Sequence, residues 1–495
     1  MKQQAGSAHF EMPVLMALIT IATMGILFSL GIAVSAEGAM ARLLAGSFAA
    51  MAFAFGIFCI LSARFYRHSF LYAKNVPEAA GSAPWPLPTV AVAMPIYNED
   101  PTATRKNIAR LKKLKYAKGR INYYALDDSD VPAISAAIER ACRDYGVAYL
   151  HRTKRAGFKA GAINWLLKSS SEQLIAIFDA DEYLIDVNFL LDLVPYFGDK
   201  SIAFVQTEKK YAKGTFFSEC VDTFYSVFSR SIQTSRAFLG KAQLKGSCCL
   251  IRRSAIEAIG GFPECVTEDM FFGLESDRNR FRSVCVQKVY ALGKPVTTFT
   301  ELVTQQRRYG YGGAQLMMSL FGRDIQQRSA VSKGTEVSKL DYATHGMGIF
   351  TSAFIAVFVL LSVLAVSAHA AALEVMGFLA IVCTAIVSVI LTQSFSKGIL
   401  IWRFNFALVS TRLGSALAAL LGMTPREMWY KDAAGPAANG IYHALHASAA
   451  EFSFAAVLLA AGIFSALAHD LLGAAWLFTY SLLFGSSTAF FLKYG

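Results

Sequence analysis

The chain consists of long apolar stretches near its two ends and a polar, charge-rich block between them. Each stretch is close to the roughly 20 residues that an α-helix needs to cross a bilayer. The pattern therefore predicts a polytopic α-helical membrane protein, with two spans before the polar block and four after it. The predicted spans lie at about 13–34, 43–63, 346–367, 372–393, 451–468 and 471–492.

One further apolar stretch, residues 398–422, contains Arg403 and Arg412. A charge at bilayer depth is costly, so we expect an interfacial amphipathic segment here in preference to a seventh span. With six spans, Arg42 is the sole Lys or Arg of the non-cytoplasmic loops, as the positive-inside rule requires. The prediction is a multi-pass protein of the cell inner (plasma) membrane, with the polar block and both termini cytoplasmic.

The polar block alternates strand-like runs with segments of helical spacing. This alternation predicts an α/β domain with a mostly parallel sheet, whose ligands bind at the carboxyl ends of the strands. The strand-like runs are 89–94, 121–126 and 174–178, and the helical segments are 102–116 and 131–146. The predicted organisation is a membrane region at 1–74, a cytoplasmic domain at 75–313, an interfacial helix or linker at 314–345 and a membrane region at 346–495.

The composition narrows the class of protein. Hydrophobic residues make up 55% of the chain and charged residues only 17%, which excludes an ordinary soluble protein. The net charge of +12 is explained by the positive cytoplasmic segments of a membrane protein, so no nucleic-acid partner is expected. The eight cysteines form no CxxC pair and have no histidine at zinc-ligand spacing, and we expect free thiols.

Two carboxylates follow the strand-like run that ends at Phe178. Asp179 and Asp181 stand one residue apart, and such a pair at a strand end can hold a hard divalent cation, Mg²⁺ or Mn²⁺, which neutralises a diphosphate. The same DxD pattern also occurs by chance on protein surfaces. Its position directly after so apolar a run favours the metal site.

Asp127 and Asp128 end another strand-like run and should face the same crevice. They suit either a base and ribose pocket or an Asx turn or helix cap. Asp130 is the better cap for the helix that starts at Pro132, which leaves the earlier pair for ligand binding.

A basic loop punctuated by glycines, residues 151–161, leads into a predicted helix. One interpretation is a solvated cationic loop. The sharper one is a diphosphate clamp, because glycines allow close approach of the backbone and Lys159 supplies a point charge.

Two motifs later in the polar block point to group transfer. Glu268 and Asp269 precede an apolar helix start, where they suit either helix capping or, for Asp269, a general base that takes the proton from an attacking sugar hydroxyl. Gln305, Arg308 and Tyr309 can face one ligand from an amphipathic helix. Arg308 would stabilise a leaving diphosphate, and Tyr309 would stack on a sugar. A basic helix at the membrane surface is also expected here.

Together these motifs resemble the processive, membrane-integrated glycosyltransferases of family 2, which include the cellulose, hyaluronan, chitin and curdlan synthases. The resemblance covers about residues 88–313 motif by motif and implies a GT-A-like catalytic domain. It implies catalysis by Asp269, Glu268, Arg308 and Gln305, UDP-sugar binding by Pro95, Tyr97, Glu99, Asp127, Asp128, Lys159 and Asp179, a metal on Asp179 and Asp181, and acceptor contacts from Tyr309, Gly246, Ser247 and Cys248.

One position departs from the family pattern. Tyr309 stands where the family has the tryptophan of its QxxRW motif. A tyrosine offers a smaller stacking face, which puts acceptor geometry, linkage and processivity in doubt and leaves the transfer chemistry intact.

The resemblance implies an inverting enzyme that polymerises a β-linked polysaccharide, with a β-glucan favoured, from a UDP-sugar. The growing polysaccharide is the acceptor, and it would be extruded across the lipid bilayer, where export partner proteins could receive it. The alternatives are a hyaluronan-, chitin- or mannan-type synthase that uses another nucleotide sugar, and a non-processive transferase to a polyprenyl lipid. A transporter with a regulatory polar block is the non-enzyme alternative, but it predicts polar residues along the spans, which are sparse here.

Overall fold

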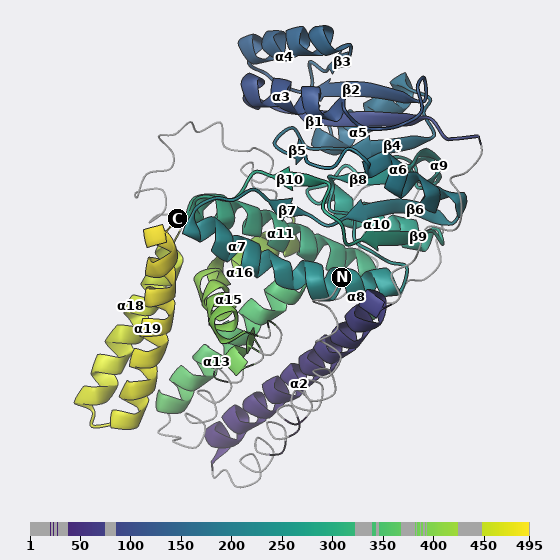
Figure 1. Ribbon diagram of the computed structural model, residues 1–495. Coiled ribbons are helices and arrows are strands. Elements are labelled where there is room, and N and C mark those ends of the chain that lie inside the picture. Colours follow the sequence, from purple (N-terminus) through teal and green to yellow (C-terminus); the bar gives the residue numbers. More distant parts are fainter. Residues whose placement is uncertain are drawn as a thin grey trace.

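The computed structural model of the chain has a mixed α/β domain at one end and long apolar helices at the other (Figure 1). The predicted fold class, an α/β domain combined with membrane-type helices, is confirmed. The predicted spans at 13–34 and 372–393 lie mostly outside the described residues. The structure describes residues 20, 23, 27, 38–74, 86–321, 339–342, 346–367, 382, 384–386, 388–389, 392, 394–423 and 448–494.

Seven strands form the main sheet, in the order β3-β2-β1-β4-β8-β6-β9. Four of the strand pairs are parallel, whereas β8 runs antiparallel to both of its neighbours, β4 and β6. The sheet is therefore mostly parallel, as predicted. The strands are β1 (Val90–Ile96), β2 (Ile121–Asp127), β3 (Ala148–His151), β4 (Leu174–Ile177), β6 (Ile202–Thr207), β8 (Cys249–Arg252) and β9 (Arg282–Val286).

The central strands are apolar along their whole length. β1 reads VAVAMPI and β4 reads LIAI, and nearly every residue of both is buried. Strands that are covered by helices on both faces show this continuous pattern, whereas half-exposed strands alternate. Two separate cores follow from it, one that contains Phe189 and Leu250 and one that contains Ile163 and Phe272.

Helices and a small second sheet complete the α/β domain. The second sheet has the order β5-β10-β7, with β5 (Tyr183–Leu184), β7 (Lys210–Tyr211) and β10 (Ala291–Gly293). The helices are α3 (Pro101–Leu111), α4 (Pro132–Tyr145), α5 (Phe158–Ser169), α6 (Phe189–Leu193), the 3₁₀ turn η2 (Val194–Gly198), α7 (Phe216–Val227), the π-helix η3 (Phe228–Gln233), α8 (Thr234–Phe238), α9 (Arg253–Ala258), α10 (Glu268–Arg278), α11 (Phe299–Leu320) and α12 (Lys339–Tyr342).

The predicted strands and helices of the domain are largely confirmed. β1, β2 and β4 match the three predicted strands, and α4 matches the second predicted helix. The helix predicted at 102–116 ends earlier, at Leu111. Leu114 lies beyond that end and still packs into the core, so apolar spacing continues past the helix and hides its end.

The predicted cap of α4 is wrong. The residue at the N-cap is Val131, and no side chain caps the helix. Asp130 instead accepts hydrogen bonds from Asn98 Nδ2 (2.7 Å) and from the Tyr97 hydroxyl (3.3 Å). A contact with the loop after β1 therefore takes the place of the local cap that the sequence spacing favoured.

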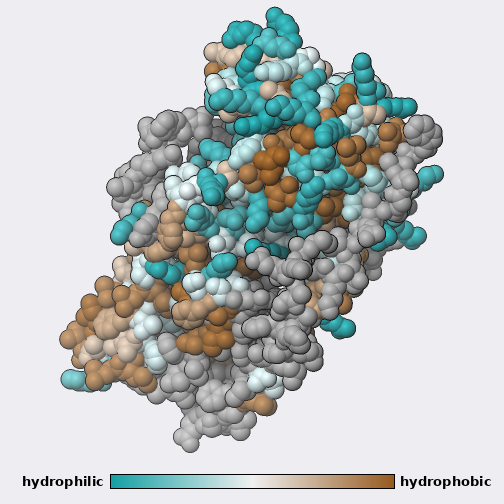
Figure 2. Space-filling model, in the orientation of Figure 1, coloured by the Kyte–Doolittle hydropathy of each residue, from teal (hydrophilic) through white to brown (hydrophobic). Residues whose placement is uncertain are grey.

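Three helices among the described residues are long and apolar enough to cross a bilayer. They are α13 (Met347–Ser367), α18 (Ala449–Leu467) and α19 (Leu471–Tyr494), and they coincide with predicted spans. The predicted span at 43–63 lies within α2 (Ala39–Lys74), whose apolar part is Arg42–Ile57. Apolar side chains gather on the surface of α18 and α19, whereas hydrophilic side chains dominate the α/β domain (Figure 2). These features are those of a membrane protein.

The stretch predicted to lie at the interface forms two helices, α15 (Phe395–Ala407) and α16 (Val409–Leu420). Each is shorter than the roughly 20 residues that a span needs. α16 packs along α11 and also meets α13, and α15 meets α7 and α19. α7, α11 and α16 thus form a layer between the sheet and the apolar helices (Figure 1).

Candidate active site

A cleft of about 300 Å³ opens at the carboxyl edge of the main sheet. We call it the sheet-edge cleft. The strand ends, the start of α10 and one face of α11 meet here because parallel strands deliver their carboxyl ends to one edge. Most of the predicted site residues line it, namely Pro95, Tyr97, Glu99, Asp128, Lys159, Asp179, Asp181, Gly246, Glu268, Asp269, Gln305, Arg308 and Tyr309.

The DxD carboxylates lie in the floor of this cleft among lysines. Asp179 pairs with Lys159 and lies 3.9 Å from Lys209 Nζ. Lys209 also pairs with Glu182 at 2.9 Å. Burial alone would lower the pKa of Lys159, but Asp179 and Glu268 outweigh it, so that pKa is raised and the lysine stays charged. The cleft therefore presents matched charges of both signs.

Gly246 allows the backbone to approach these charged groups. Its φ is +76°, and a Cβ atom there would lie 3.3 Å from Asp269 Oδ2 and 3.6 Å from Lys159 Nζ. The missing side chain lets the Gly246 carbonyl accept a hydrogen bond from Lys159 Nζ at 2.8 Å. The positive φ and the close approach both require glycine at this position.

Ser247 and Cys248 do not line the sheet-edge cleft. Ser247 is buried and donates a hydrogen bond to the Glu182 carboxylate. The Cys248 carbonyl accepts from Thr207 Oγ1 at 2.6 Å, and burial raises the pKa of the Cys248 thiol to about 12. Both residues, which were predicted to contact the acceptor, therefore lie behind the wall of the cleft.

The Asp127–Asp128 pair is divided between two roles. Asp127 is fully buried and accepts hydrogen bonds from the Tyr149 hydroxyl (2.7 Å) and the Ser129 N–H (3.0 Å). The latter bond is the Asx turn that the sequence left open. Asp128 lines the cleft and is bound by Arg152, with Nε at 2.7 Å from Oδ1.

An aromatic and cationic wall stands beside Asp128. The Arg155 guanidinium carbon lies 3.4 Å from the centre of the Tyr97 ring and 4.9 Å from that of the Phe158 ring. Tyr97, Asp128 and Arg155 also line an adjoining hollow of about 890 Å³. A flat, polar ring such as a nucleobase has both a stacking partner and hydrogen-bonding groups here.

Glu268 and Asp269 begin α10 and lie side by side in the cleft. Burial and the charge of Asp269 raise the pKa of the Glu268 carboxyl to about 7, and burial raises that of Asp269. Asp269 Oδ1 accepts a hydrogen bond from the Met270 N–H at 2.8 Å. A half-buried carboxylate with a raised pKa is a stronger base than a surface aspartate.

Tyr225 of α7 contacts three side chains of α11 at the border of the cleft. The Tyr225 hydroxyl donates to Gln305 Oε1 at 2.9 Å and accepts from Gln306 Nε2 at 3.2 Å. Its ring meets that of Tyr309 edge to face, with the centres 6.2 Å apart. Tyr309 is 43% exposed, so part of its side chain stays accessible to a ligand.

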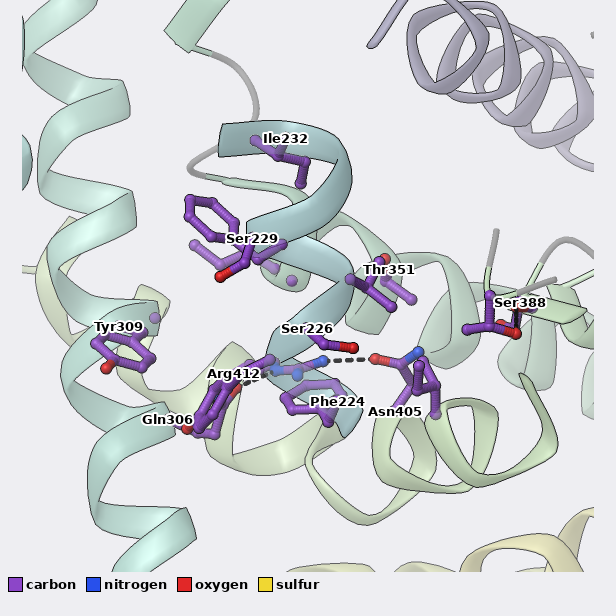
Figure 3. Close-up of a pocket in the computed structure, with 18 of the residues that line it drawn as sticks. Phe224, Ser226, Ser229, Ile232, Gln306, Tyr309, Thr351, Ser388, Asn405 and Arg412 are labelled. Carbon is purple, nitrogen blue, oxygen red and sulfur yellow. Dashed lines mark hydrogen bonds between the residues drawn. The ribbon is translucent and has the colours of Figure 1, made fainter. Parts of the chain in front are cut away.

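A second cavity of about 360 Å³ adjoins the sheet-edge cleft on the side of the apolar helices. We call it the membrane-side cavity. It shares Lys209, Tyr211, Lys245, Asp269 and Tyr309 with the cleft, and Figure 3 shows Tyr309 at one side of it. Aromatic, hydroxyl and amide side chains line much of the rest, among them Phe55, Phe224, Thr351, Ser388, Trp402 and Asn405, together with the charged side chains of Glu208, Lys210, Asp222 and Arg412.

Sequence reasoning missed several residues of this region. Lys209 and Glu182 pair in the cleft. The position of Glu182 directly after the DxD motif is the signal that could have identified it. Tyr225 and Arg412 join α7 and α16 to α11. No local pattern pointed to them, because each lies far along the chain from its partner.

The donor set of the cleft fits a divalent cation. No three His, Cys, Asp or Glu side chains gather into a metal cage among the residues that the structure describes. Asp179 and Asp181 are both partly exposed and line the same cleft. Mg²⁺ and Mn²⁺ commonly bind through one or two carboxylates plus substrate phosphates, and two adjacent carboxylates meet that need.

The chain is similar in sequence to known glycosyltransferases. The family model described as "Glycosyl transferase family group 2" matches residues 174–392. A cellulose synthase catalytic subunit [UDP-forming] of Xanthomonas axonopodis pv. citri is 30% identical over 267 residues, which cover 52% of this chain and 36% of that protein. A probable glucomannan 4-beta-mannosyltransferase of Oryza sativa subsp. japonica is 27% identical and covers 49% and 43%.

Lipid-modifying relatives match as well. A beta-monoglucosyldiacylglycerol synthase of Nostoc sp. is 25% identical over 258 residues, which cover 50% of this chain and 53% of that protein. The chain thus spans between about a third and a half of the length of these curated relatives. Among solved structures, a mannosyltransferase from Pyrobaculum calidifontis in complex with GDP-Man and Mn²⁺ has a TM-score of 0.49 at 16% identity, covering 74% of this chain and 98% of that one.

Proposed function

Because the chain belongs to glycosyltransferase family 2 and is distantly homologous to cellulose synthase catalytic subunits, we propose that it polymerises a β-linked polysaccharide from a UDP-sugar. A β-glucan is favoured, and the product leaves across the membrane. The observation that carries this proposal is the position of Asp269 and Tyr309, which line both the sheet-edge cleft and the membrane-side cavity. A donor in the first and an acceptor in the second would meet at these two residues.

The donor would occupy the sheet-edge cleft. Tyr97, Glu99 and Asp128 surround a space suited to the nucleoside, and Pro95 shapes its floor. Lys159 faces the diphosphate. A divalent cation on Asp179 and Asp181 would supply charge neutralisation to that diphosphate. The name of the Xanthomonas relative, which is UDP-forming, supports UDP as the nucleotide.

Transfer would proceed as a single displacement with inversion. An acceptor hydroxyl oxygen attacks the anomeric carbon of the donor, the bond from that carbon to the diphosphate oxygen breaks, and the nucleoside diphosphate leaves. Asp269, with Glu268 beside it, takes the hydroxyl proton. Arg308 and Gln305 stand on α11 where they can stabilise the departing diphosphate.

The acceptor would extend into the membrane-side cavity. Tyr309 offers its open ring to the terminal sugar, and Gly246 borders the same junction. Ser247 and Cys248 would not contact the acceptor directly. They would only support the wall of the cleft. The serine and threonine residues that are scattered along the apolar helices, such as Thr351 and Ser388, gather on this cavity (Figure 3). A chain of sugars needs such hydroxyl and aromatic contacts, which supports a path for the product.

The location follows from the same proposal. α13, α18 and α19, together with the apolar part of α2, would cross the cell inner (plasma) membrane, and the α/β domain and both termini would be cytoplasmic. α15 and α16 would lie at the interface. Export partner proteins would receive the polymer beyond the bilayer.

One observation favours a second candidate. The Nostoc relative is named a beta-monoglucosyldiacylglycerol synthase, and the membrane-side cavity has apolar walls at Phe55, Phe354 and Ile355. A lipid acceptor with a single added sugar would fit these features, whether diacylglycerol or polyprenyl phosphate. A hyaluronan-, chitin- or mannan-type polymer would need only a different donor sugar.

A product assay decides among these candidates. Membranes that carry the full chain are incubated with radiolabelled UDP-glucose, UDP-N-acetylglucosamine, GDP-mannose and related donors, and the products are separated into lipid and polymer fractions. We expect label from UDP-glucose in polymer that a β-glucan-specific glycosidase releases. Label confined to the lipid fraction would replace polymer synthesis by lipid glycosylation, and no incorporation from any donor beyond that of Asp269→Asn membranes would overturn the proposed function.

A further inference from the structure

Arg412 is a buried cation in the wall of the membrane-side cavity. Its side chain is only 4% exposed. Its Nε donates to Gln306 Oε1 at 2.9 Å, and its Nη1 donates to Asn405 Oδ1 at 2.8 Å (Figure 3). No Asp or Glu among the described residues forms an ion pair with it. Burying an unpaired charge is costly, so the arginine at this position calls for an explanation.

Among the described residues, a second buried arginine shows what an ordinary structural solution looks like. Arg236 is 1% exposed and donates to the Asp341 carbonyl at 2.6 Å. Burial lowers the pKa of the Arg236 guanidinium, and Tyr342, Asp341 and Asp277 offset part of that effect. The direct partners of Arg236 are backbone carbonyls with carboxylates nearby, whereas those of Arg412 are side-chain amide oxygens. Nearby carboxylates therefore do not account for the burial of Arg412.

The partners of Arg412 lead from α16 to the transfer site. Gln306 accepts from Arg412 and donates to the Tyr225 hydroxyl (3.2 Å), which in turn donates to Gln305 (2.9 Å). The Tyr225 ring also packs edge to face on Tyr309. A continuous set of contacts thus runs from the membrane-side cavity to Gln305 and Tyr309, two of the α11 side chains that line the cleft.

Close packing also fixes the position of α11 against α16. A Cβ atom at Gly310 would lie 2.3 Å from Ser415 Oγ and 3.2 Å from the Arg412 carbonyl oxygen. α11 can therefore approach α16 this closely only because residue 310 lacks a side chain. The packing and the hydrogen bonds are independent observations, and both fix α11 against α16.

We propose that Arg412 is a positioning residue, which acts through Gln306 and Tyr225 to hold α11 so that Tyr309 faces the acceptor. The inference rests on the proposed function, because it assigns Arg412 to the acceptor side of that same site. Arg412 touches neither Lys159 nor Asp179, so the donor half should be independent of it. Loss of Arg412 should therefore weaken the use of acceptor and leave donor binding intact.

The test compares Arg412→Met with Arg403→Met in the full chain in detergent. Arg403 is a matched control, because it lies on the neighbouring α15, donates to the Ser486 carbonyl and does not line the membrane-side cavity. Amide hydrogen exchange over residues 301–311 reports the order of α11. We expect exchange about tenfold faster in Arg412→Met and unchanged exchange in Arg403→Met. Unchanged exchange in both variants would overturn the inference even if the protein made no polymer.

Kinetics separate positioning from a general loss of structure. We expect Arg412→Met to lower kcat/KM for an added acceptor oligosaccharide about tenfold, with UDP affinity unchanged, and Arg412→Lys to restore part of the loss. Combining Arg412→Met with Gln306→Leu should lower kcat/KM no further than Arg412→Met alone, because both remove one coupled contact. Fully additive losses, or an equal loss of UDP affinity, would overturn the inference. Failure of the wild type to transfer any sugar would count against the proposed function alone.

Discussion

The sheet-edge cleft and the membrane-side cavity are neighbours that differ in the groups that line them. In the cleft, carboxylates and cations are already matched, as in the pairs of Asp179 with Lys159 and of Glu182 with Lys209. In the cavity, aromatic, hydroxyl and amide groups stand beside the charged groups, and no Asp or Glu of the described residues forms an ion pair with Arg412. A site with paired charges suits an ionic ligand that exchanges into the pairs, whereas aromatic and hydroxyl walls suit a neutral, amphipathic chain that moves.

Asp269 and Tyr309 belong to both spaces. The difference between the two spaces therefore assigns expected effects: variants in the cleft should impair donor binding, variants in the cavity should impair acceptor use, and variants at the junction should impair transfer itself. The predictions below test this division.

Asp269→Asn should have the largest effect, because it removes the base at the junction. We expect transfer to fall by about 10²- to 10⁴-fold while UDP affinity stays within about twofold of wild type. Polymer formation from radiolabelled donor and UDP binding by calorimetry measure the two halves. Transfer at the wild-type rate would remove Asp269 as the base.

Asp179→Ala and Asp181→Ala should act on the cleft alone. Removal of one carboxylate should weaken UDP binding in the presence of Mg²⁺ or Mn²⁺ by about a hundredfold, because several kcal/mol of charge neutralisation depend on the cation. Titration of UDP with and without the cation measures this. Asp192→Ala is the control, since Asp192 pairs with Lys288 outside the cleft. Equal UDP affinity of all three variants with the cation present would contradict the metal site.

Gly310→Ala should disrupt the packing of α11 on α16 by steric overlap. The added Cβ would lie 2.3 Å from Ser415 Oγ, and overpacking of this kind costs about 1–3 kcal/mol. Gly414→Ala on the same α16 is the control, because its Cβ would meet nothing within 4 Å and alanine favours a helix. Thermal unfolding should show a lower Tm for Gly310→Ala and an equal or higher one for Gly414→Ala. A reversed order would refute the close packing of α11 on α16.

The pH dependence of transfer should reveal the crowded carboxylates at the junction. The base must be deprotonated, and the pKa values of Asp269 and Glu268 are both raised, so activity should fall as the pH drops through values above the ordinary range of an aspartate. Glu268→Gln removes the neighbouring carboxylate and should move this acidic limb to lower pH. The measurement is kcat/KM against pH. A shift to higher pH would show that Glu268 does not raise the pKa of the base.

Tyr309→Trp should have the smallest effect, because it exchanges one stacking ring for a larger one. We expect activity within about threefold of wild type, and a tenfold loss in Tyr309→Ala, in line with the roughly 0.5–1.5 kcal/mol of an aromatic contact. Initial rates and the length of the polymer are measured together. Complete loss in Tyr309→Trp would mean that the junction is shaped for a different acceptor from that of its tryptophan-bearing relatives.

Most of the sheet-edge cleft could be predicted because its residues follow local patterns. Asp179 comes directly after an apolar run, Asp128 follows Asp127 at the end of another, and parallel strands bring such ends to one edge. The same reasoning placed Asp127 there too, yet the Tyr149 hydroxyl holds its carboxylate inside the domain. Adjacent residues at a strand end point in different directions, and neighbouring strands decide which one faces the ligand.

The sequence by itself determined the strands, the apolar helices and the order of the chemical motifs, because periodicity, helix length and strand ends are properties of short segments. Only the tertiary structure decided which distant segments meet. Arg412 lies 106 positions after Gln306 along the chain, and Tyr225 lies 81 before it. The sequence predicted a segment at the membrane surface around Arg412, but the packing of α16 on α11 buries this side chain. Such contacts depend on the register of packed helices, which no local pattern records.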